Sequence, residues 1–479
     1  MKKFLYILLV IFFPVVSFSQ WQSDVRLTNA QGDSFVSLNN SRCLAAFQNL
    51  LYAVWADERD GNREIYYKKS LDNGQTWGSD VNLSNNSYTS WRPCIANYTG
   101  YLHIVWCDNR DGNFEIYYRR SYDGGVNFQP ETRLTNTSDI SWAPSLAVNQ
   151  AVMHLVWEEL ISGNEEIYYK KSTNNGETWS NDLRLTNDPF GSFYPSVAVS
   201  ENNVHVTWYD FRSGHRAVFY KRSTDAGETW ESDTQLTFST GESYNSGIAV
   251  NGQTVHISFH DTRTGNEDIY YLRSSDNGMN WTETAITNTP GISWYPSISV
   301  SGSNVHLAWY DTTSGNYEIY YAHSTDAGLS WLPNERLTYD TARSYRPSIL
   351  ASDTNLHIIW NDGRDGNLEV YYKRNPHGNT IAVNNISSEI PEYFYLSQNY
   401  PNPFNPVTTI EYHCSKKSNV EIRIFDITGK QIAQPVNRIH TPGKYSVRWN
   451  AGGMESGVYL YTMYLDGIPT ETRKMLYIK

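Results

Sequence analysis

The sequence predicts an all-β protein: a seven-bladed β-propeller with four-stranded antiparallel blades, followed by a small all-β module. Three observations predict it. A motif centred on one aromatic residue recurs along the chain, each period contains four short strand-like stretches, and no segment has a helical period. Four strands in about 50 residues, repeated around a ring, are typical of a propeller. The recurring aromatic residues, at steps of 51 with one of 50, are Trp55, Trp106, Trp157, Trp208, Phe259, Trp309 and Trp360.

The composition is that of a folded chain, and nucleic acid is not expected as a partner. The protein has 479 residues, of which 14% are aromatic and only 18% are charged, so long disorder is excluded. The 38 Lys and Arg residues against 50 Asp and Glu residues give a net charge of −12, and no basic run offers a footprint for phosphate. The 4 cysteines are too few for a disulfide framework and are expected to be small buried residues.

The N-terminus predicts export. Lys2 and Lys3 precede the apolar stretch from Phe4 to Val16, and Ser17 and Ser19 fit the small positions before a cleavage site. Residues 1–19 therefore predict a signal peptide, with a membrane anchor as the alternative. The apolar stretch is shorter than the about 20 residues that a spanning helix needs, so we expect no transmembrane segment in the mature chain.

Each period predicts its own four strands, and the ends of the chain predict how the ring closes. One strand follows a Pro-Ser pair, the second ends at the recurring aromatic, the third contains Tyr-Tyr and the fourth reads Arg-Leu-Thr. The seventh copy ends near Asn379 without a fourth strand, whereas Trp21–Thr28 matches Trp77–Ser84 and has no copy before it. We therefore expect the N-terminal strand to close the last blade, which hides the edge of the propeller over residues 20–380.

A turn motif, Ser-x-Asp-x-Gly-x-x-Trp, lies between the third and fourth strands. Four copies are complete, two have one substitution, and the seventh, Asn375–Asn379, is eroded. The motif resembles the Asp-box, or BNR, repeat of sialidases and other propellers. Because Asp can accept turn amides and Gly can adopt a positive φ, the motif is expected to be structural. The complete copies begin at Ser70, Ser223, Ser274 and Ser324, and the variants contain Phe128 and Asn174.

The C-terminal part lacks the 51-residue period. Residues 381–391 predict a polar linker and residues 392–479 a second module, which has a Pro-rich entry at Tyr400–Pro406 and ends in Lys474–Lys479. The module resembles the C-terminal sorting domain of the type IX secretion system of Bacteroidetes and their relatives. The resemblance implies a β-sandwich, handling by the type IX machinery, and a secreted or cell-surface location at the outer membrane. An appended carbohydrate-binding sandwich is the alternative.

Three rings of residues are predicted on the face opposite the Asp-boxes. The first two, acids and arginines just beyond the recurring aromatic, are interpreted as inter-blade ion pairs and turn hydrogen bonds. The third ring opens the first strand of each blade, and Asn40 takes that place in blade one. The acids are Asp57, Asp108, Glu159, Asp210, Asp261, Asp311 and Asp362; the arginines are Arg59, Arg110, Arg212, Arg263 and Arg364.

The third ring supplies the candidate binding residues. Aromatic faces beside polar groups suit sugar stacking, although core packing explains the same pattern. We expect a glycan or protein ligand to bind at the central mouth. The candidate residues are Trp91, Arg92, Trp142, Phe193, Tyr244, Trp294, Tyr345 and Arg346.

No metal or cofactor is expected. Six equivalent histidines, each three residues before the recurring aromatic, cannot converge on one ion and are expected to be structural. The loops Asp57–Asn62 and Asp362–Asn367 faintly resemble calcium loops, but an arginine stands at the third ligand position; a structural calcium remains an alternative. The histidines are His103, His154, His205, His256, His306 and His357.

Catalysis is the less favoured hypothesis. The resemblance to sialidases implies an arginine triad, a tyrosine nucleophile with a glutamate, and an aspartate acid/base, which together make an asymmetric site. The charges here repeat almost blade by blade, so we expect no Tyr and Glu pair set apart from the others. The nearest match to the arginine motif is Trp91–Pro93 or Tyr345–Pro347, and Glu158, Glu159, His215 and Arg216 depart from the repeat. We therefore favour a monomeric binding propeller over a sialidase-like exo-glycoside hydrolase.

Overall fold

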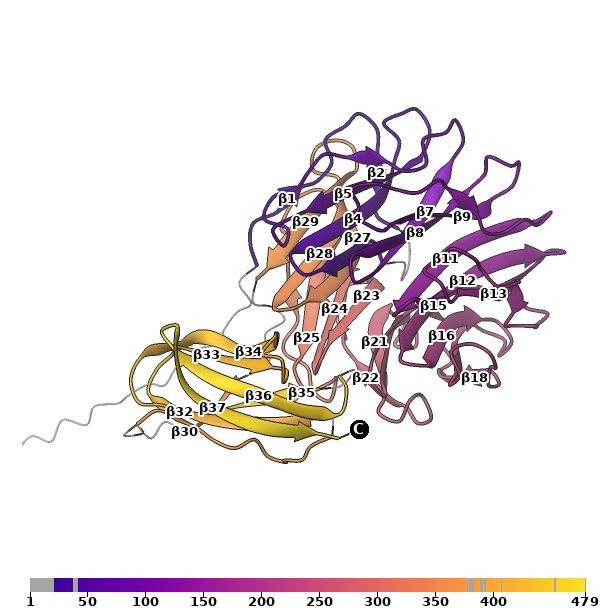
Figure 1. The fold of residues 1–479 in the computed structure, drawn as a ribbon. Helices are drawn as coiled ribbons and strands as arrows, with labels where there is room; N and C mark the ends of the chain where they lie inside the picture. Colours follow the sequence, from indigo (N-terminus) through magenta and orange to yellow (C-terminus); the bar gives the residue numbers. More distant parts are fainter. Residues whose placement is uncertain are drawn as a thin grey trace, which may run out of the picture.

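A computed structural model describes residues 21–37, 42–376, 378, 383–387, 391, 393–405, 407–451 and 454–478. All of its elements are β-strands, arranged as seven sheets around one axis and two further sheets beyond them (Figure 1). The predicted signal peptide lies outside these residues. Among the described residues, no helix is long and apolar enough to cross a membrane.

The seven sheets are the predicted blades, each built from consecutive strands running outward from the axis. Blades two to four contain β7 (Ser90–Tyr98), β8 (Tyr101–Asp108), β9 (Glu115–Ser121) and β10 (Thr132–Arg133); β11 (Ile140–Asn149), β12 (Val152–Ile161), β13 (Asn164–Ser172) and β14 (Leu183–Arg184); and β15 (Ser192–Ser200), β16 (Asn203–Asp210), β17 (Ala217–Ser223) and β18 (Thr234–Gln235). Blades five and six contain β19 (Ser243–Asn251), β20 (Thr254–Asp261), β21 (Asp268–Ser274) and β22 (Thr282–Ala285); and β23 (Ser293–Ser301), β24 (Asn304–Asp311), β25 (Glu318–Ser324) and β26 (Glu335–Arg336).

The N-terminal strand closes the ring, as predicted. Blade seven contains β27 (Ser344–Ser352), β28 (Asn355–Asp362), β29 (Glu369–Asn375) and, on the outside, β1 (Val25–Arg26). β1 pairs antiparallel with β29 through Val25 opposite Tyr372. The first and last segments of the propeller therefore share one sheet, which leaves no unpaired blade edge at the junction.

Blade one differs from its siblings at its inner edge. It contains β2 (Ser34–Phe35), β3 (Leu44–Phe47), β4 (Leu50–Asp57), β5 (Glu64–Ser70) and β6 (Val81–Asn82), and both β2 and β3 pair with β4. Phe35 lies opposite Ala56, just as Trp91 lies opposite Cys107 in blade two. Phe35 is thus the aromatic ring residue of this blade. The expectation of Asn40 there is corrected: an insertion after Phe35 shifts the sequence spacing, and Asn40 lies outside the described residues.

The Asp-boxes link neighbouring blades. In the first, Ser70 Oγ donates to Asp72 at 2.7 Å and accepts the amide of Gly74 at 2.8 Å. The box aromatic of each blade then packs edge-on against a strand-three tyrosine of the preceding blade, with ring centroids 4.9–5.4 Å apart. The pairs are Trp77–Tyr372, Phe128–Tyr67, Trp179–Tyr118, Trp230–Tyr169, Trp281–Tyr220, Trp331–Tyr271 and Trp21–Tyr321.

The C-terminal module contains two four-stranded sheets around its own apolar core, which includes Tyr412, Trp449 and Tyr461. One sheet has the order β30 (Val383–Ser387), β35 (Gly443–Asn450), β32 (Val407–Cys414), β31 (Tyr395–Leu396); the other has β34 (Gln431–His440), β33 (Ser418–Phe425), β36 (Gly457–Leu465), β37 (Ile468–Tyr477). β30 falls inside the predicted linker, so this sheet begins before residue 392. An edge strand needs backbone pairing on one side only, and β30 obtains it from β35 despite its polar sequence.

Candidate functional site

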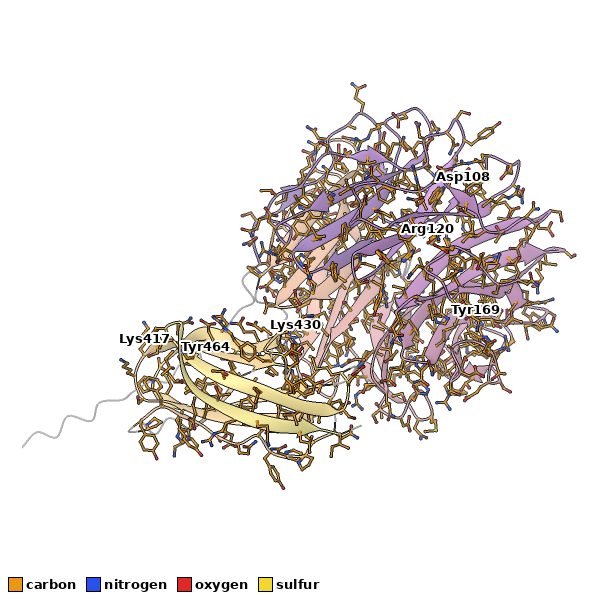
Figure 2. The ribbon with its side chains drawn as sticks, viewed as in Figure 1. Asp108, Arg120, Tyr169, Lys417, Lys430 and Tyr464 are labelled. Carbon is orange, nitrogen blue, oxygen red and sulfur yellow. The ribbon has the colours of Figure 1, made fainter. Side chains whose placement is uncertain are left out.

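The acids of the mouth are structural. Asp108, labelled in Figure 2, is fully buried; it accepts Ser90 Oγ at 2.8 Å and the indole N–H of Trp106 at 3.1 Å, and Arg110 Nη2 pairs with it at 2.6 Å. Arg110 also pairs with Glu131 of the same blade. The equivalent acids of the other six blades are likewise buried and accept the matching serine. The arginines pair mainly within their own blade, which corrects the expectation of inter-blade ion pairs. Arg212 in addition contacts Asp188, in the loop that joins blades three and four, at 3.4 Å.

The histidine ring is also structural. Nδ1 of each of the six histidines lies 2.5–2.8 Å from a tyrosine hydroxyl on the neighbouring strand. Burial lowers the pKa of His103, His205, His256 and His357 to about 3, and that of His154 to about 4, so these rings are neutral. They join strands two and three of blades two to seven near the Asp-box end.

A bulge in the innermost strand creates the lining of the mouth. In blades two to seven the pairing with the second strand is interrupted directly after the ring aromatic, for example between Trp91 and Cys94. The next residue has a positive φ between 48° and 55° in all six blades, which breaks the alternation of inward and outward side chains. These residues are Arg92, Ala143, Tyr194, Asn245, Tyr295 and Arg346.

The bulge residues converge across the axis. Arg92 Nη2 of blade two donates to the hydroxyl of Tyr194 of blade four at 3.3 Å, past the whole of blade three. Tyr295 of blade six interacts electrostatically with Arg92, with Tyr194 and with Arg346 of blade seven. Residues as far apart in the sequence as Arg92 and Arg346 thus come together at the axis.

A second set of axial residues follows the recurring aromatic, and it differs from blade to blade. The residues are Ala56, Cys107, Glu158, Tyr209, His260, Tyr310 and Asn361. Together with the bulge residues they overturn the expectation that the mouth lacks an asymmetric set. We call Arg92, Glu158, Tyr194, Tyr209 and Tyr295 the axial cluster. In the sequence, the axial cluster could have been found from the repeat positions at which the residue type changes from blade to blade. The charged residues that recur in every blade belong instead to the structural scaffold.

Arg92 is the most unusual member of the axial cluster. It is 6% exposed, and its guanidinium lies over the rings of Trp142 at 4.5 Å and Tyr194 at 5.0 Å. Its Nε and Nη1 atoms are buried and have no hydrogen-bond partner within the described residues. A buried cation with unused donors is costly, and an anionic acceptor would complete its hydrogen bonds.

Glu158 lies beside Arg92 and Tyr194 in the same cluster. Its side chain is 9% exposed, and Oε2 accepts the backbone amide of Tyr194 at 3.1 Å. Burial raises the pKa of Glu158 to about 7, although that amide and Arg92 act in the opposite direction. Burial and the nearby Glu158 also raise the pKa of Tyr209 far above its ordinary value. The axial cluster therefore combines a fixed positive charge with a carboxyl group that titrates near neutrality.

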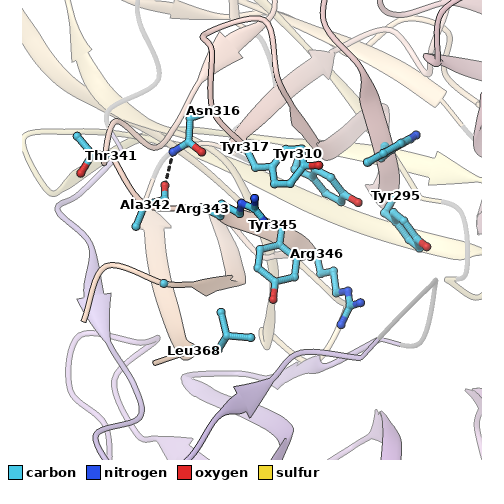
Figure 3. Close-up of a pocket in the computed structure, with 12 residues that line it drawn as sticks. Tyr295, Tyr310, Asn316, Tyr317, Thr341, Ala342, Arg343, Tyr345, Arg346 and Leu368 are labelled. Atoms are coloured by element: carbon cyan, nitrogen blue, oxygen red, sulfur yellow. Dashed lines mark hydrogen bonds between the residues drawn. The ribbon is translucent and has the colours of Figure 1, made fainter. Parts of the chain in front are cut away.

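A cavity of about 620 Å³ opens beside the axial cluster, between blades six and seven (Figure 3). Its lining includes Trp294, Tyr317, Tyr345, Arg343 and Arg346, together with Tyr295 of the axial cluster. No Asp or Glu is among the residues that line it. We call this space the side cavity.

The predicted binding residues divide into two groups. Arg92 and Arg346 reach the axis, and Trp294, Tyr345 and Arg346 line the side cavity. The other ring aromatics are partly buried in packing contacts: Trp91 with Phe35 and Arg63, Trp142 with Phe114, Phe193 with Tyr209, and Tyr244 with His260. The sequence reasoning missed Glu158, Tyr194, Tyr209, Tyr295 and His260 as axial residues.

The described residues contain no cluster of three or more His, Cys, Asp or Glu side chains suited to a metal ion. In the loop that faintly resembles a calcium loop, Arg59 donates to both carboxylate oxygens of Asp57 at 2.6 and 2.8 Å. The Arg59 guanidinium therefore already binds both oxygens of the carboxylate that a calcium ion would need as a ligand.

The fold and the repeat define a class, an Asp-box propeller with a C-terminal module. Residues 48–307, more than half of the chain, match the model of the BNR repeat-like domain, and residues 398–479 match that of the secretion system C-terminal sorting domain. The chain belongs to the BNR repeat-like family. Its sorting domain indicates that the type IX secretion system secretes it, to the cell surface or outside the cell.

Solved structures share the propeller fold at low sequence identity. An ulvan lyase of polysaccharide lyase family PL25, bound to -[GlcA(1-4)Rha3S]-, has a TM-score of 0.53 at 11% identity, covering 73% of this chain and 95% of its own. A second structure titled ulvan lyase has a TM-score of 0.51 at 12% identity, covering 72% and 94%. A Trypanosoma rangeli sialidase has a TM-score of 0.44 at 12% identity, covering 82% and 85%. A search of curated protein sequences gave no match.

Proposed function

We propose that this exported propeller binds an acidic oligosaccharide at its central mouth, with Arg92 as the residue that receives the negative charge. The observation that carries the proposal is the buried guanidinium with two unused donor atoms, Nε and Nη1, beside Tyr194 and Trp142. A carboxylate or sulfate accepts two parallel hydrogen bonds from such a group. The aromatic rings beside it offer flat faces to a sugar.

The glycan-active neighbours support the same class of ligand. The ulvan lyase structure holds a glucuronate-containing disaccharide on a propeller of this fold. At 11% identity the likeness concerns the fold alone, so the proposal rests on the axial cluster. A protein ligand with exposed carboxylates is the competing reading, and the binding test separates the two.

The test is a glycan array of uronate-containing, sialylated, sulfated and neutral saccharides, followed by titration calorimetry on the hits. We expect acidic glycans to bind. Arg92→Ala should lower their affinity by about 30-fold, since a charged hydrogen-bond pair contributes about 2 kcal/mol. Ala143 holds the same bulge position in blade three with a φ of 50°, so the fold accepts alanine there. Arg120→Ala, which removes an equal charge near the Asp-box end, is the control (Figure 2). Binding that prefers neutral glycans, or that ignores Arg92, contradicts the proposal.

Cleavage of the bound glycan is a second candidate function. The observation that favours it is Glu158, a buried carboxyl with a pKa of about 7, in the same cluster as the hydroxyls of Tyr194 and Tyr209. Such a group can give or take a proton near neutral pH. A sialidase-like exo-glycoside hydrolase remains one version of this candidate. A fluorogenic sialoside, a reducing-end assay and ultraviolet detection of unsaturated products distinguish sialidase, other hydrolase and lyase activity, and Glu158→Gln should abolish whichever is found.

A further inference from the structure

Three arginines without a described carboxylate partner, Arg92, Arg343 and Arg346, gather near the mouth and the side cavity. The arginines of the mouth ring, such as Arg59 and Arg212, are paired with carboxylates at 2.6 Å. Among the described residues, the guanidinium groups of Arg343 and Arg346 have no ion-pair or hydrogen-bond partner; they lie over the rings of Tyr317 at 5.2 Å and Tyr345 at 5.3 Å, respectively. Within the described part of the chain, none of these three guanidinium groups forms an ion pair with a carboxylate, and Arg92 also has two unused donor atoms.

Aromatic rings give the side cavity fixed walls. Trp294 lies 6.2 Å from Tyr317 and 5.8 Å from Tyr310, and Tyr310 lies 6.2 Å from Tyr345, all measured between ring centroids. Asn316 donates its amide to the backbone carbonyl of Ala342, which fixes the loop that carries Arg343 (Figure 3). The cavity is thus a shaped pocket with flat apolar walls, two free guanidinium groups and no acid.

The repeat shows that these features belong to one junction between blades. At the position of Arg343 the sibling blades have Asp33, Thr89, Ile140, Gly191, Glu242 and Ile292. In blade five, Glu242 instead pairs with Arg216 at 3.2 Å, which neutralises both charges. Blade seven is therefore the blade whose sequence has arginine both at the position of Arg343 and at the bulge position, Arg346.

Tyr295 links the side cavity to the axial cluster. Tyr295 lines the side cavity and also interacts with Arg92, Tyr194 and Arg346. A ligand that places one acidic group at Arg92 can therefore continue past Tyr295 and Arg346 toward Arg343, over the rings of Trp294 and Tyr345.

We propose that the side cavity is an outer subsite for a second acidic sugar, so that the ligand is an extended polyanionic glycan and not a single terminal residue. This inference rests on the proposed binding of an acidic glycan at the axial cluster. It assigns Arg92 to the first acidic group, Arg346 to the junction and Arg343 to the next acidic group along the chain.

The experiment measures affinity against ligand length. The probes are galacturonic acid and its oligomers of two and four residues, so that the shortest probe carries a single acidic group, together with oligosaccharides of two and three GlcA(1-4)Rha3S repeats as sulfated polyanions. We expect the wild-type protein to gain at least about tenfold in affinity from the shortest probe to the next, as an added charged hydrogen bond provides. Arg343→Ile, which installs the residue of blades three and six, should remove that gain and leave the affinity for the shortest probe unchanged. Tyr317→Leu, which copies Leu368 of blade seven, should reduce the gain in part.

The outcomes separate the two proposals. If Arg92→Ala weakens every length while Arg343→Ile changes none, the outer subsite is wrong and the axial site stands. If affinity does not rise with length in the wild type, the outer subsite is also wrong. If no acidic probe binds, or Arg92→Ala has no effect, the proposed function fails and the subsite with it. Equal thermal unfolding midpoints for the wild type and Arg343→Ile show that the loss is local.

Discussion

The two ends of the propeller follow opposite rules. At the Asp-box end the same serine, acid, glycine and box aromatic recur, and the aromatic of one blade packs on a tyrosine of the preceding blade. At the mouth, the residues that reach the axis change from blade to blade: Arg92, Glu158 and Tyr209 have no copies at equivalent positions except Arg346 and Tyr310. In a repeat protein, positions that recur build the scaffold, whereas positions that vary can form a site of unlike groups.

The same difference between recurring and varying positions separates two residues at the mouth. Asp210 and Arg92 are both charged, buried and at the mouth. Asp210 accepts from Ser192, Trp208 and Arg212 and is therefore satisfied by its own blade. Arg92 has one hydrogen bond, at 3.3 Å, and two unused donors. Substitutions at these two kinds of residue should therefore affect stability and binding differently.

Asp210→Ala should be the most destabilising of these changes. It leaves Arg212 and the indole of Trp208 without their buried acceptor, and breaking a buried pair in this way costs about 3–5 kcal/mol. Urea denaturation followed by tryptophan fluorescence measures the loss in the free energy of unfolding. Ser192→Ala, which removes one neutral partner of the same carboxylate, should cost about 1 kcal/mol. A loss below 1 kcal/mol for Asp210→Ala is incompatible with a structural role.

Trp230→Ala should come next, at about 2–3 kcal/mol. The ring is only partly buried and packs edge-on on Tyr169 at 5.0 Å, so the loss lies below the about 3–5 kcal/mol of a fully buried tryptophan. Trp21→Ala, at the closure of the ring, should cost about the same because it makes the equivalent contact with Tyr321 at 5.3 Å. Calorimetric melting of both variants checks this. Glycan affinity should not change in either, and a loss of affinity at full folding would show that the binding face was misassigned.

How much of this the sequence could predict follows from the same contrast. The 51-residue period, the box motif and the unmatched strand Trp21–Thr28 predicted seven blades and their closure, because each depends on local pattern alone. Phe35 was missed because an inserted loop hides its register with Ala56. Tyr194 and Tyr295 were missed because a bulge turns them out of the strand alternation, and such a break depends on backbone geometry rather than on residue type. The polar strand β30 was read as linker since its pairing with β35 lies far away in sequence.

The pH dependence of glycan affinity tests whether Glu158 lies in the binding space. The pKa of Glu158 is raised to about 7 in the folded protein, so the carboxyl is protonated below that pH and negative above it. An acidic glycan meets no repulsion from the neutral form, and its affinity should fall by about tenfold as the pH rises from 6 to 8, because a nearby like charge costs about 1–2 kcal/mol.

Glu158→Gln is the matched control for this pH dependence, since it keeps the size and removes the titration. Its affinity should stay flat across the range, at the level of the wild type at pH 6. Calorimetric titration in a series of buffers of equal ionic strength gives both profiles. A wild-type affinity that is constant between pH 6 and 8 would falsify the assignment of Glu158 to the binding space.

Arg92→Ala should have the smallest effect on stability, although its effect on binding is large. The variant loses the ring contacts with Trp142 and Tyr194 but also removes a buried charge with unused donors, and these opposing contributions should leave the free energy of unfolding within about 1 kcal/mol of the wild type. Denaturation with and without the acidic glycan separates the effect of the substitution on stability from its effect on binding. A ligand in 100-fold excess over its Kd stabilises the wild type by about 2.7 kcal/mol, and the variant should gain clearly less at the same concentration. If Arg92→Ala instead unfolds the protein as Asp210→Ala does, Arg92 is part of the scaffold, and the rule that varying axial positions form the site is wrong at its most informative residue.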